Sequence, residues 1–193
     1  MAMFSWENWP LLFLCSAMIV CAVIDGWKLR VPNWLTFPLI VSGWLLGLVY
    51  TCGLAEGKGG LGSSFTGSML GFGLLLPIYA IGGMGAGDVK MQMGFGAWIG
   101  AVFGMSPGMK MIFYAFCAAV IIGGGIALVQ IVVRGQYGRN LANTRAIVGD
   151  LFGAPNIGTV ADRAAKRKPT MHLLPYGIPL CLGSVGYLIF LFS

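Results

Sequence analysis

Six stretches of mostly apolar residues dominate the chain and limit what it can fold into. They cover residues 9–24, 34–52, 65–81, 89–105, 111–133 and 173–192. A helix that crosses the hydrocarbon core of a bilayer needs about 20 such residues, and slightly fewer suffice where neighbouring protein adjusts the ends. The pattern therefore predicts an all-α integral membrane protein with about six transmembrane helices, forming a single domain over residues 1–193.

The shortage of charged side chains excludes soluble alternatives. Charged residues make up 9% of the chain, against about 25% in soluble domains, so a soluble fold of this size could not cover its surface. The formal net charge of +6 is therefore interpreted as membrane topology and not as a nucleic-acid-binding surface. The five cysteines contain no C-x-x-C pair, so no zinc site or disulfide framework is expected. The only histidine, His172, is more typical of a loop or interface than of a catalytic site.

Lys and Arg are distributed unequally between the segments that join the predicted helices. If the N-terminus lies outside, ten of the 12 basic residues fall on the cytoplasmic side, and only Lys58 and Lys110 fall outside. This distribution satisfies the positive-inside rule. The stretch before residue 9 has no Lys or Arg, so we expect the first helix to remain as a membrane helix and not to be a cleaved signal peptide.

One long polar segment, at about residues 134–172, is predicted to be a cytoplasmic basic loop. It holds seven of the ten cytoplasmic Lys and Arg residues. Part of it could form a short helix on the inner leaflet, or the whole segment could be an ordinary connection whose charges set the topology. The sequence leaves both interpretations open.

Two acidic residues fall near membrane depth, where a carboxylate is costly and invites a functional hypothesis. Asp25 ends the first predicted helix and Asp88 precedes the fourth, so both are expected at the cytoplasmic end of the bundle. Each also has a structural interpretation: Asp88 could be an N-cap that accepts a backbone N–H, and Asp25 could pair with Lys28 or Arg30. The string Gly85-Ala86-Gly87-Asp88 is weak alone in a chain with 31 glycines.

The surroundings of both aspartates together form a more specific pattern. Asp25 is followed by Pro32-Asn33-Trp34-Leu35-Thr36, and Asp88 lies within Gly83-Met84-Gly85-Ala86-Gly87-Asp88-Val89-Lys90, with Gly96-Ala97-Trp98-Ile99-Gly100 further on. In this order, these residues resemble the type IV prepilin peptidases, which are bacterial membrane aspartyl proteases with a G-x-G-D motif. The resemblance covers roughly residues 23–100, with a weaker echo in Leu174-Pro175-Tyr176-Gly177.

This resemblance implies an aspartic endopeptidase in which Asp25 and Asp88 form a proton-sharing catalytic pair, with no metal or organic cofactor. Gly85 and Gly87 would let the turn bend and let an extended substrate approach Asp88. Lys90 would either help to keep Asp88 ionised or extend to the membrane interface, and we favour the second role.

The resemblance also implies a substrate and a location. The family removes a basic leader from prepilins or pseudopilins on the cytoplasmic side of the bacterial inner membrane, next to the apolar helix that anchors the substrate in the bilayer. Larger members carry paired C-x-x-C motifs and methylate the new N-terminus. Here 24 residues precede Asp25 and no C-x-x-C is present, so we expect a compact peptidase of the tight-adherence (Flp/Tad-like) pilus type without methyltransferase activity.

Two other classes of function remain open from the sequence alone. Paired carboxylates between Gly-rich helices could relay protons or bind ions in a small transporter, although no inverted repeat is visible. The chain could also be an inactive scaffold subunit of a pilus or secretion complex, and the presence of both Asp25 and Asp88 argues against that role. The sequence does not give the substrate's identity, the oligomeric state or the distance between the aspartates.

Overall fold

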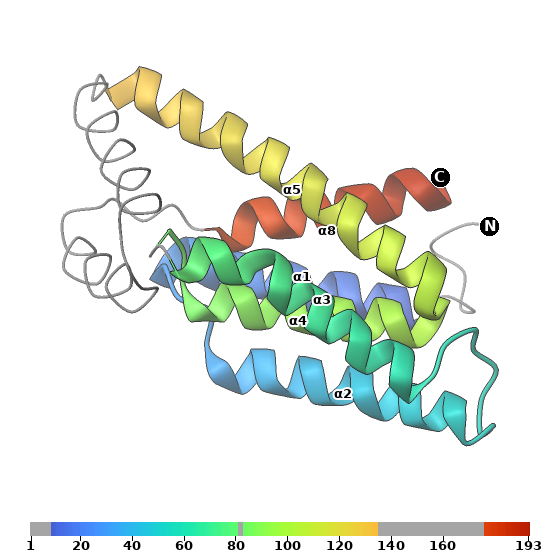
Figure 1. Ribbon diagram of the computed structural model, residues 1–193. Helices are drawn as coiled ribbons and strands as arrows, with labels where there is room; N and C mark the ends of the chain where they lie inside the picture. Colours follow the sequence, from blue (N-terminus) through green and yellow to red (C-terminus); the bar gives the residue numbers. More distant parts are fainter. Residues whose placement is uncertain (1–8, 81–82, 135–175) are drawn as a thin grey trace, which may run out of the picture.

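The computed structural model describes residues 9–80, 83–134 and 176–193, which form a bundle of helices (Figure 1). The helices are α1 (Trp9–Lys28), α2 (Asn33–Thr51), α3 (Leu61–Ala80), α4 (Ala86–Phe103), α5 (Met105–Arg134) and α8 (Gly177–Phe192). The described ranges contain no strand. Each of the predicted helices corresponds to one of these elements, and the all-α prediction is confirmed.

The apolar character of the helices agrees with a membrane protein. Helices α1, α2 and α3, and α5 over Met105–Gln130, are long and apolar enough to cross a bilayer. Helix α8 is apolar but only 16 residues long. Side chains such as Phe13 on α1, Leu45 on α2 and Ile121 on α5 are about half exposed or more, as expected for helices that face lipid.

The boundary between α4 and α5 differs from the prediction. Helix α4 begins at Ala86 and α5 begins at Met105, whereas the sequence predicted starts at residues 89 and 111. Gly104 alone separates the two helices, with a φ of 82° that glycine adopts without strain. Pro107 falls in the first turn of α5, where proline is tolerated because the first N–H groups of a helix have no intrahelical partner. The short loop predicted before residue 111 is therefore helical.

Helix α4 occupies the centre of the bundle and contacts α1, α2, α3, α5 and α8. It packs closely on α3, because a Cβ atom added at Gly67 would collide with the backbone oxygen of Gly96, and one at Gly96 would collide with that of Gly67. Small residues let membrane helices approach until their backbones touch. The glycines of α4 therefore explain how a helix of modest hydropathy has 12 of its 18 residues buried.

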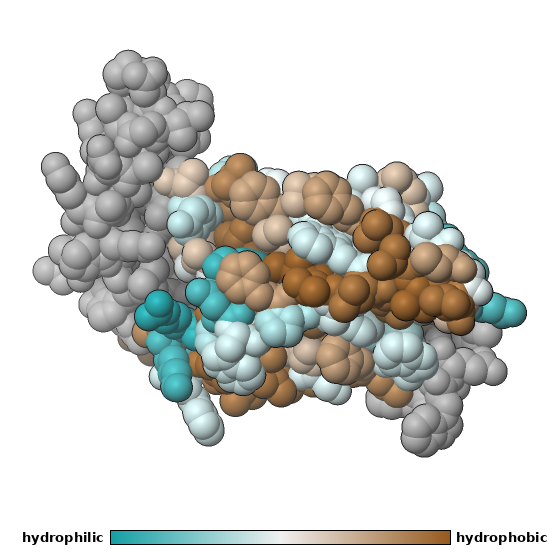
Figure 2. All heavy atoms as spheres, turned by 90° about the horizontal axis from the view of Figure 1, so that it is seen from below, coloured by the Kyte–Doolittle hydropathy of each residue, from teal (hydrophilic) through white to brown (hydrophobic). Residues whose placement is uncertain are grey.

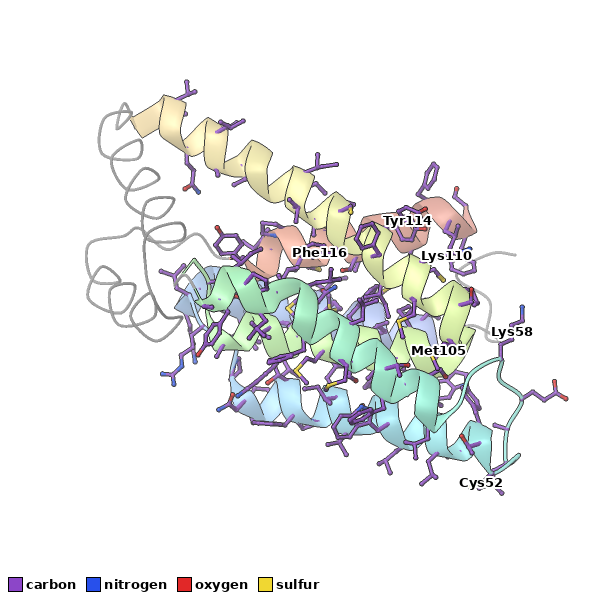
Figure 3. All side chains as sticks on the ribbon, in the orientation of Figure 1. Cys52, Lys58, Met105, Lys110, Tyr114 and Phe116 are labelled. Atoms are coloured by element: carbon purple, nitrogen blue, oxygen red, sulfur yellow. The ribbon has the colours of Figure 1, made fainter. Side chains whose placement is uncertain are left out.

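Successive helices run in alternating directions, so each end of the bundle collects a fixed set of termini. One end holds the C-terminal ends of α1, α3 and α5 and the N-terminal ends of α2, α4 and α8 (Figure 1). Lys58 and Lys110 lie at the opposite end (Figure 3). Apolar side chains run along the flank of the molecule, and hydrophilic ones gather toward its ends (Figure 2). Asp25 and Asp88 therefore lie at one end of the bundle, as the helix order predicted.

The predicted basic loop over residues 134–172, including His172, lies outside the described residues apart from Arg134, the last residue of α5. Its interpretation, and the assignment of the whole chain to one domain, stay predictions.

Candidate functional site

Asp25 is held in the last turns of α1 by a contact with a distant part of the chain. Its side chain is 2% exposed, and its Oδ2 accepts a hydrogen bond of 2.8 Å from the backbone N–H of Gly177. Gly177 is the first residue of α8, and the N–H groups of a first helical turn have no partner within their own helix. The carboxyl group therefore satisfies one of these donors and interacts with the positive end of the α8 dipole.

Only glycine fits at position 177, because the backbone there lies too close to Asp25 to leave room for a side chain. A Cβ atom there would lie 2.8 Å from Oδ2, 2.9 Å from Cβ and 3.0 Å from Cγ of Asp25. Distances this short are not compatible with van der Waals packing, so any larger residue would move the carboxyl group. The glycine lets the start of α8 come close enough to hydrogen-bond to the carboxyl oxygen.

Asp88 lies in the first turn of α4 and is 5% exposed. Gly85 is the N-cap, so Asp88 is the third residue of the helix and not the cap that the structural interpretation suggested. Its Oδ2 accepts a hydrogen bond of 3.2 Å from the backbone N–H of Gly85, which is the capping-box contact of an acidic residue at this position. Its Oδ1 is buried, and no group in the described residues hydrogen-bonds to it. Capping thus uses one of the two carboxyl oxygens.

The two aspartates, 63 positions apart in the sequence, share one environment. Helix α1 packs against α4, and both contact α8. Cys21, which lies one turn before Asp25 on the same helix, is fully buried. The alternative in which Asp25 pairs with Lys28 or Arg30 is not what the structure shows, because both basic residues are exposed and the Asp25 carboxyl group contacts α8.

The two motif glycines have different surroundings from those that the resemblance implied. Gly85 has φ −83° and ψ 153°, an extended conformation that other residues also adopt. A Cβ at Gly87 would lie 2.7 Å from the backbone oxygen of Val31, so the space above Gly87 is filled by the connection between α1 and α2. Gly87 therefore fixes the end of α1 against the start of α4, which sets the position of Asp25 relative to Asp88.

The side chain of Lys90 contacts α2. Its Nζ donates a hydrogen bond of 2.8 Å to Oδ1 of Asn33 and lies 4.5 Å from the centre of the Phe37 ring. Pro32 is the N-cap of α2 with φ −74°, so Pro32 and Asn33 begin the helix that receives the ammonium group. These contacts favour a tethering role for Lys90 over direct support of the Asp88 charge.

Two buried polar side chains near this end of the bundle were given no role from the sequence. Gln92 is fully buried, and within residues 9–80, 83–134 and 176–193 neither its amide nitrogen nor its amide oxygen has a hydrogen-bond partner. It lies four residues after Asp88, on the same face of α4. Thr36 of α2 is also fully buried, and its hydroxyl has no hydrogen-bond partner in the same ranges. In the sequence, Gln92 could have been noticed as a single amide side chain within an apolar helix, where a polar group is costly.

The described residues contain no cluster of three or more His, Cys, Asp or Glu side chains arranged to hold a metal ion. What they do contain is a pair of buried carboxyl groups on separate helices, each bound through one oxygen to a backbone N–H. Such a pair can exchange protons with a bound water and a substrate carbonyl.

Comparison with known proteins gives one family match and several similar relatives. Residues 12–128 match the type IV leader peptidase family, a range that includes Asp25 and Asp88. The prepilin leader peptidase/N-methyltransferase of Aeromonas hydrophila is 31% identical over 102 residues, covering 49% of this chain and 33% of that protein. The protein of the same name from Aeromonas salmonicida (strain A449) has the same identity and coverage. The alignment thus spans a third of the length of these relatives. No solved structure matches the chain.

Proposed function

The chain belongs to the type IV leader peptidase family, and from this premise we propose that it is a membrane-embedded aspartic endopeptidase that removes the leader of a prepilin or pseudopilin. The observation that carries the proposal is the geometry of the acid pair. Asp25 and Asp88 are both buried and come from two helices that pack against each other. One oxygen of Asp88 is buried and has no hydrogen-bond partner in the part of the chain that the structure describes, so it is the oxygen available to a reacting water.

The proposed reaction is hydrolysis of one peptide bond. Water adds to the scissile carbonyl carbon, and its proton passes to whichever carboxyl group is ionised. The other carboxyl group, which is protonated, gives its proton to the carbonyl oxygen. The C–N bond then breaks as the leaving nitrogen takes a proton from one carboxyl group and a hydroxyl group of the tetrahedral intermediate returns a proton to the other. The products are an amine and a carboxylic acid, one water has been consumed, and the pair again holds one proton. The backbone N–H groups of Gly85 and Gly177 hold the carboxyl groups in place throughout.

The substrate and the side of the membrane are the more detailed parts of the proposal. Ten of the 12 Lys and Arg residues lie in segments that would be cytoplasmic with the N-terminus outside, which would place Asp25 and Asp88 at the cytoplasmic face of a bacterial inner membrane. A substrate with a basic leader in the cytoplasm and an apolar helix in the bilayer would present its cleavage site there. The Flp/Tad-like pilus type and cleavage without methylation belong to the same proposal.

Substitution of the two aspartates tests this proposal. Asn retains an oxygen that can accept the hydrogen bond from Gly85 or Gly177 but cannot exchange a proton, so Asp25→Asn and Asp88→Asn should insert normally and abolish cleavage. The double variant should be scarcely worse than either single one, because residues that act as a unit have non-additive effects. Glu56→Gln, at an exposed carboxylate in the α2–α3 connection, is the matched control and should cleave at the wild-type rate.

The assay is co-expression with a small membrane protein that has a basic leader, a Gly and an apolar segment, followed by intact-mass measurement of the product. The mass also reports any added methyl group, which the proposal does not expect. A normally inserted Asp88→Asn chain that still processes this substrate at the wild-type rate would remove Asp88 from the mechanism and refute the proposal.

A further inference from the structure

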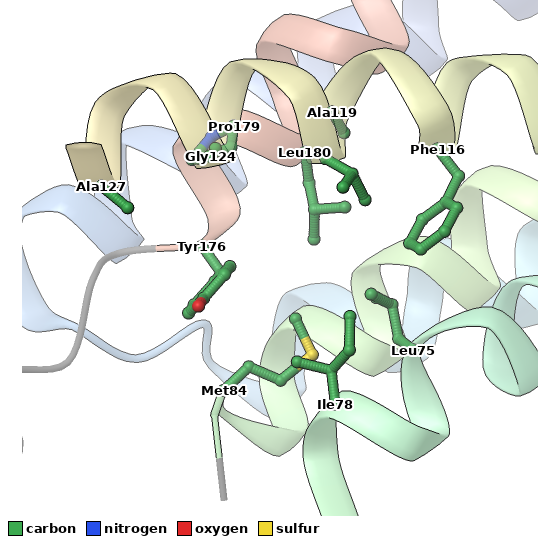
Figure 4. A pocket seen from close by; sticks show the side chains of 12 residues that line it. Leu75, Ile78, Met84, Phe116, Ala119, Gly124, Ala127, Tyr176, Pro179 and Leu180 are labelled. Carbon is green, nitrogen blue, oxygen red and sulfur yellow. The ribbon is translucent and has the colours of Figure 1, made fainter. Parts of the chain in front are cut away.

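An apolar cavity of about 240 Å³ lies between α3, α5 and α8 (Figure 4). Leu75 and Ile78 of α3 form one wall, and α5 forms the opposite wall with small residues that include Gly124 and Ala127. Apart from the phenol of Tyr176, the side chains that line the cavity are apolar. The proposed hydrolysis does not use this space.

The cavity begins beside the residues that hold the two carboxyl groups. Met84, which lines it, directly precedes Gly85, the hydrogen-bond donor to Asp88. Tyr176, on the other side of the same end, directly precedes Gly177, the donor to Asp25.

The α5 wall has room for side chains that the described part of the chain does not supply. A Cβ atom added at Gly124 would meet nothing within 4 Å, and the same holds at Gly125. Beyond the cavity the same helix exposes Leu128 at 65% and Val132 at 62%. Figure 1 shows this half of α5 diverging from the rest of the bundle.

The volume limits what can enter. An apolar cavity of about 150 Å³ holds one benzene ring, so 240 Å³ accommodates one or two large apolar side chains but not a whole helix. The backbone of an occupant must therefore lie along the outer edge of the cavity, with its side chains inserted. An apolar segment at membrane depth whose first residues follow a bond held at Asp25 and Asp88 meets these conditions.

We propose that the apolar segment on the C-terminal side of the scissile bond docks in this cavity, with large side chains inserted against Gly124 and Ala127 of α5. The inference rests on the proposed peptidase function and adds the surface that receives the substrate. It makes the small residues of α5 specificity determinants, because they set the size of side chain that fits next to the acid pair.

Two adjacent glycines provide a matched test. Gly124 lines the cavity and Gly125 does not, yet both have open space around an added Cβ. Gly124→Leu should fill the cavity and lower processing about tenfold or more, since a single extra methylene changes binding in an apolar pocket by roughly 10-fold to 200-fold. Gly125→Leu should change processing less than about twofold, and the smaller Gly124→Ala should fall in between. Equal effects at the two positions would overturn the proposal.

A second measurement separates docking from hydrolysis. The probe is a synthetic peptide with a basic leader, a Gly and an apolar segment that contains photoreactive leucine, and it is cross-linked to the Asp88→Asn chain in phospholipid vesicles. Cross-links should map to the cavity walls on α5 and α8, and Gly124→Leu should remove them. Cross-links only to lipid or to α2, or a complete lack of cross-links, would overturn the proposed docking surface.

The two readouts also distinguish failure of docking from failure of the peptidase proposal. Cross-links within the cavity without cleavage by the wild-type chain would support the docking surface and refute hydrolysis. Cleavage by the wild-type chain, with cross-links spread evenly over all faces, would refute the docking surface and leave hydrolysis standing.

Discussion

The contact between Gly177 and Asp25 makes a prediction that only the three-dimensional structure provides. In Gly177→Ala the new methyl group would lie 2.8 to 3.0 Å from three atoms of the Asp25 side chain, whereas ordinary contacts begin at 3.4 Å. The carboxyl group must therefore move by about 0.5 Å, or α8 must retreat by a similar distance, which weakens the hydrogen bond from the Gly177 N–H.

The expected loss follows from this displacement. A misplacement of about 1 Å in an active site can cost about 100-fold in rate, and a hydrogen bond to a charged group contributes about 1.5 to 3 kcal/mol. We therefore expect kcat/KM for leader cleavage to fall by about 10-fold to 100-fold, or roughly 1.4 to 2.7 kcal/mol of transition-state stabilisation. The overpacked site should also lower the free energy of unfolding by about 1 to 3 kcal/mol.

The assay compares Gly177→Ala with Gly186→Ala on the same helix, where an added Cβ meets nothing within 4 Å. Both variants are purified in detergent, their thermal unfolding is measured, and cleavage of the prepilin-like substrate is followed at a temperature where both are folded. Gly186→Ala should match the wild type. A folded Gly177→Ala chain with wild-type kcat/KM would show that the position of Asp25 does not depend on α8, and the reasoning would be wrong.

Three further predictions concern packing, burial and topology. Gly67→Ala should destabilise the chain by several kcal/mol, because its methyl group would meet the backbone oxygen of Gly96 and not a movable side chain; an unchanged melting temperature in detergent would contradict the close α3–α4 contact. Gln92→Met should raise the free energy of unfolding by about 1 to 3 kcal/mol, because it removes two buried polar atoms without partners; a lower melting temperature would mean that the amide is paired. In a chain without its native cysteines, Lys58→Cys should react with an impermeant thiol reagent from outside, and Lys28→Cys should react only after permeabilisation; the reverse pattern would place the acid pair on the wrong side for cytoplasmic leader cleavage.

The sequence alone was enough to predict the class of fold and the approximate place of every described helix. In a bilayer, backbone polar groups must be satisfied within a segment, so a long apolar run forms a helix whatever it packs against. The same logic identified Asp25 and Asp88, since an acidic residue at membrane depth stands out in the sequence. Helix order then placed both residues at one end of the bundle.

The tertiary structure decided which groups meet. Nothing in the spacing indicated that Gly177, 152 positions away, donates a hydrogen bond to Asp25, that Lys90 is bound to Asn33, or that Gly87 packs on Val31. The physical reason is that apolar residues cover both the lipid-facing and the inward-facing sides of these helices, so hydropathy does not indicate which side faces the core. The side of each helix that faces the core is set by where small residues such as Gly67 and Gly96 let two backbones touch. This contact depends on both helices of a pair and not on either sequence segment alone.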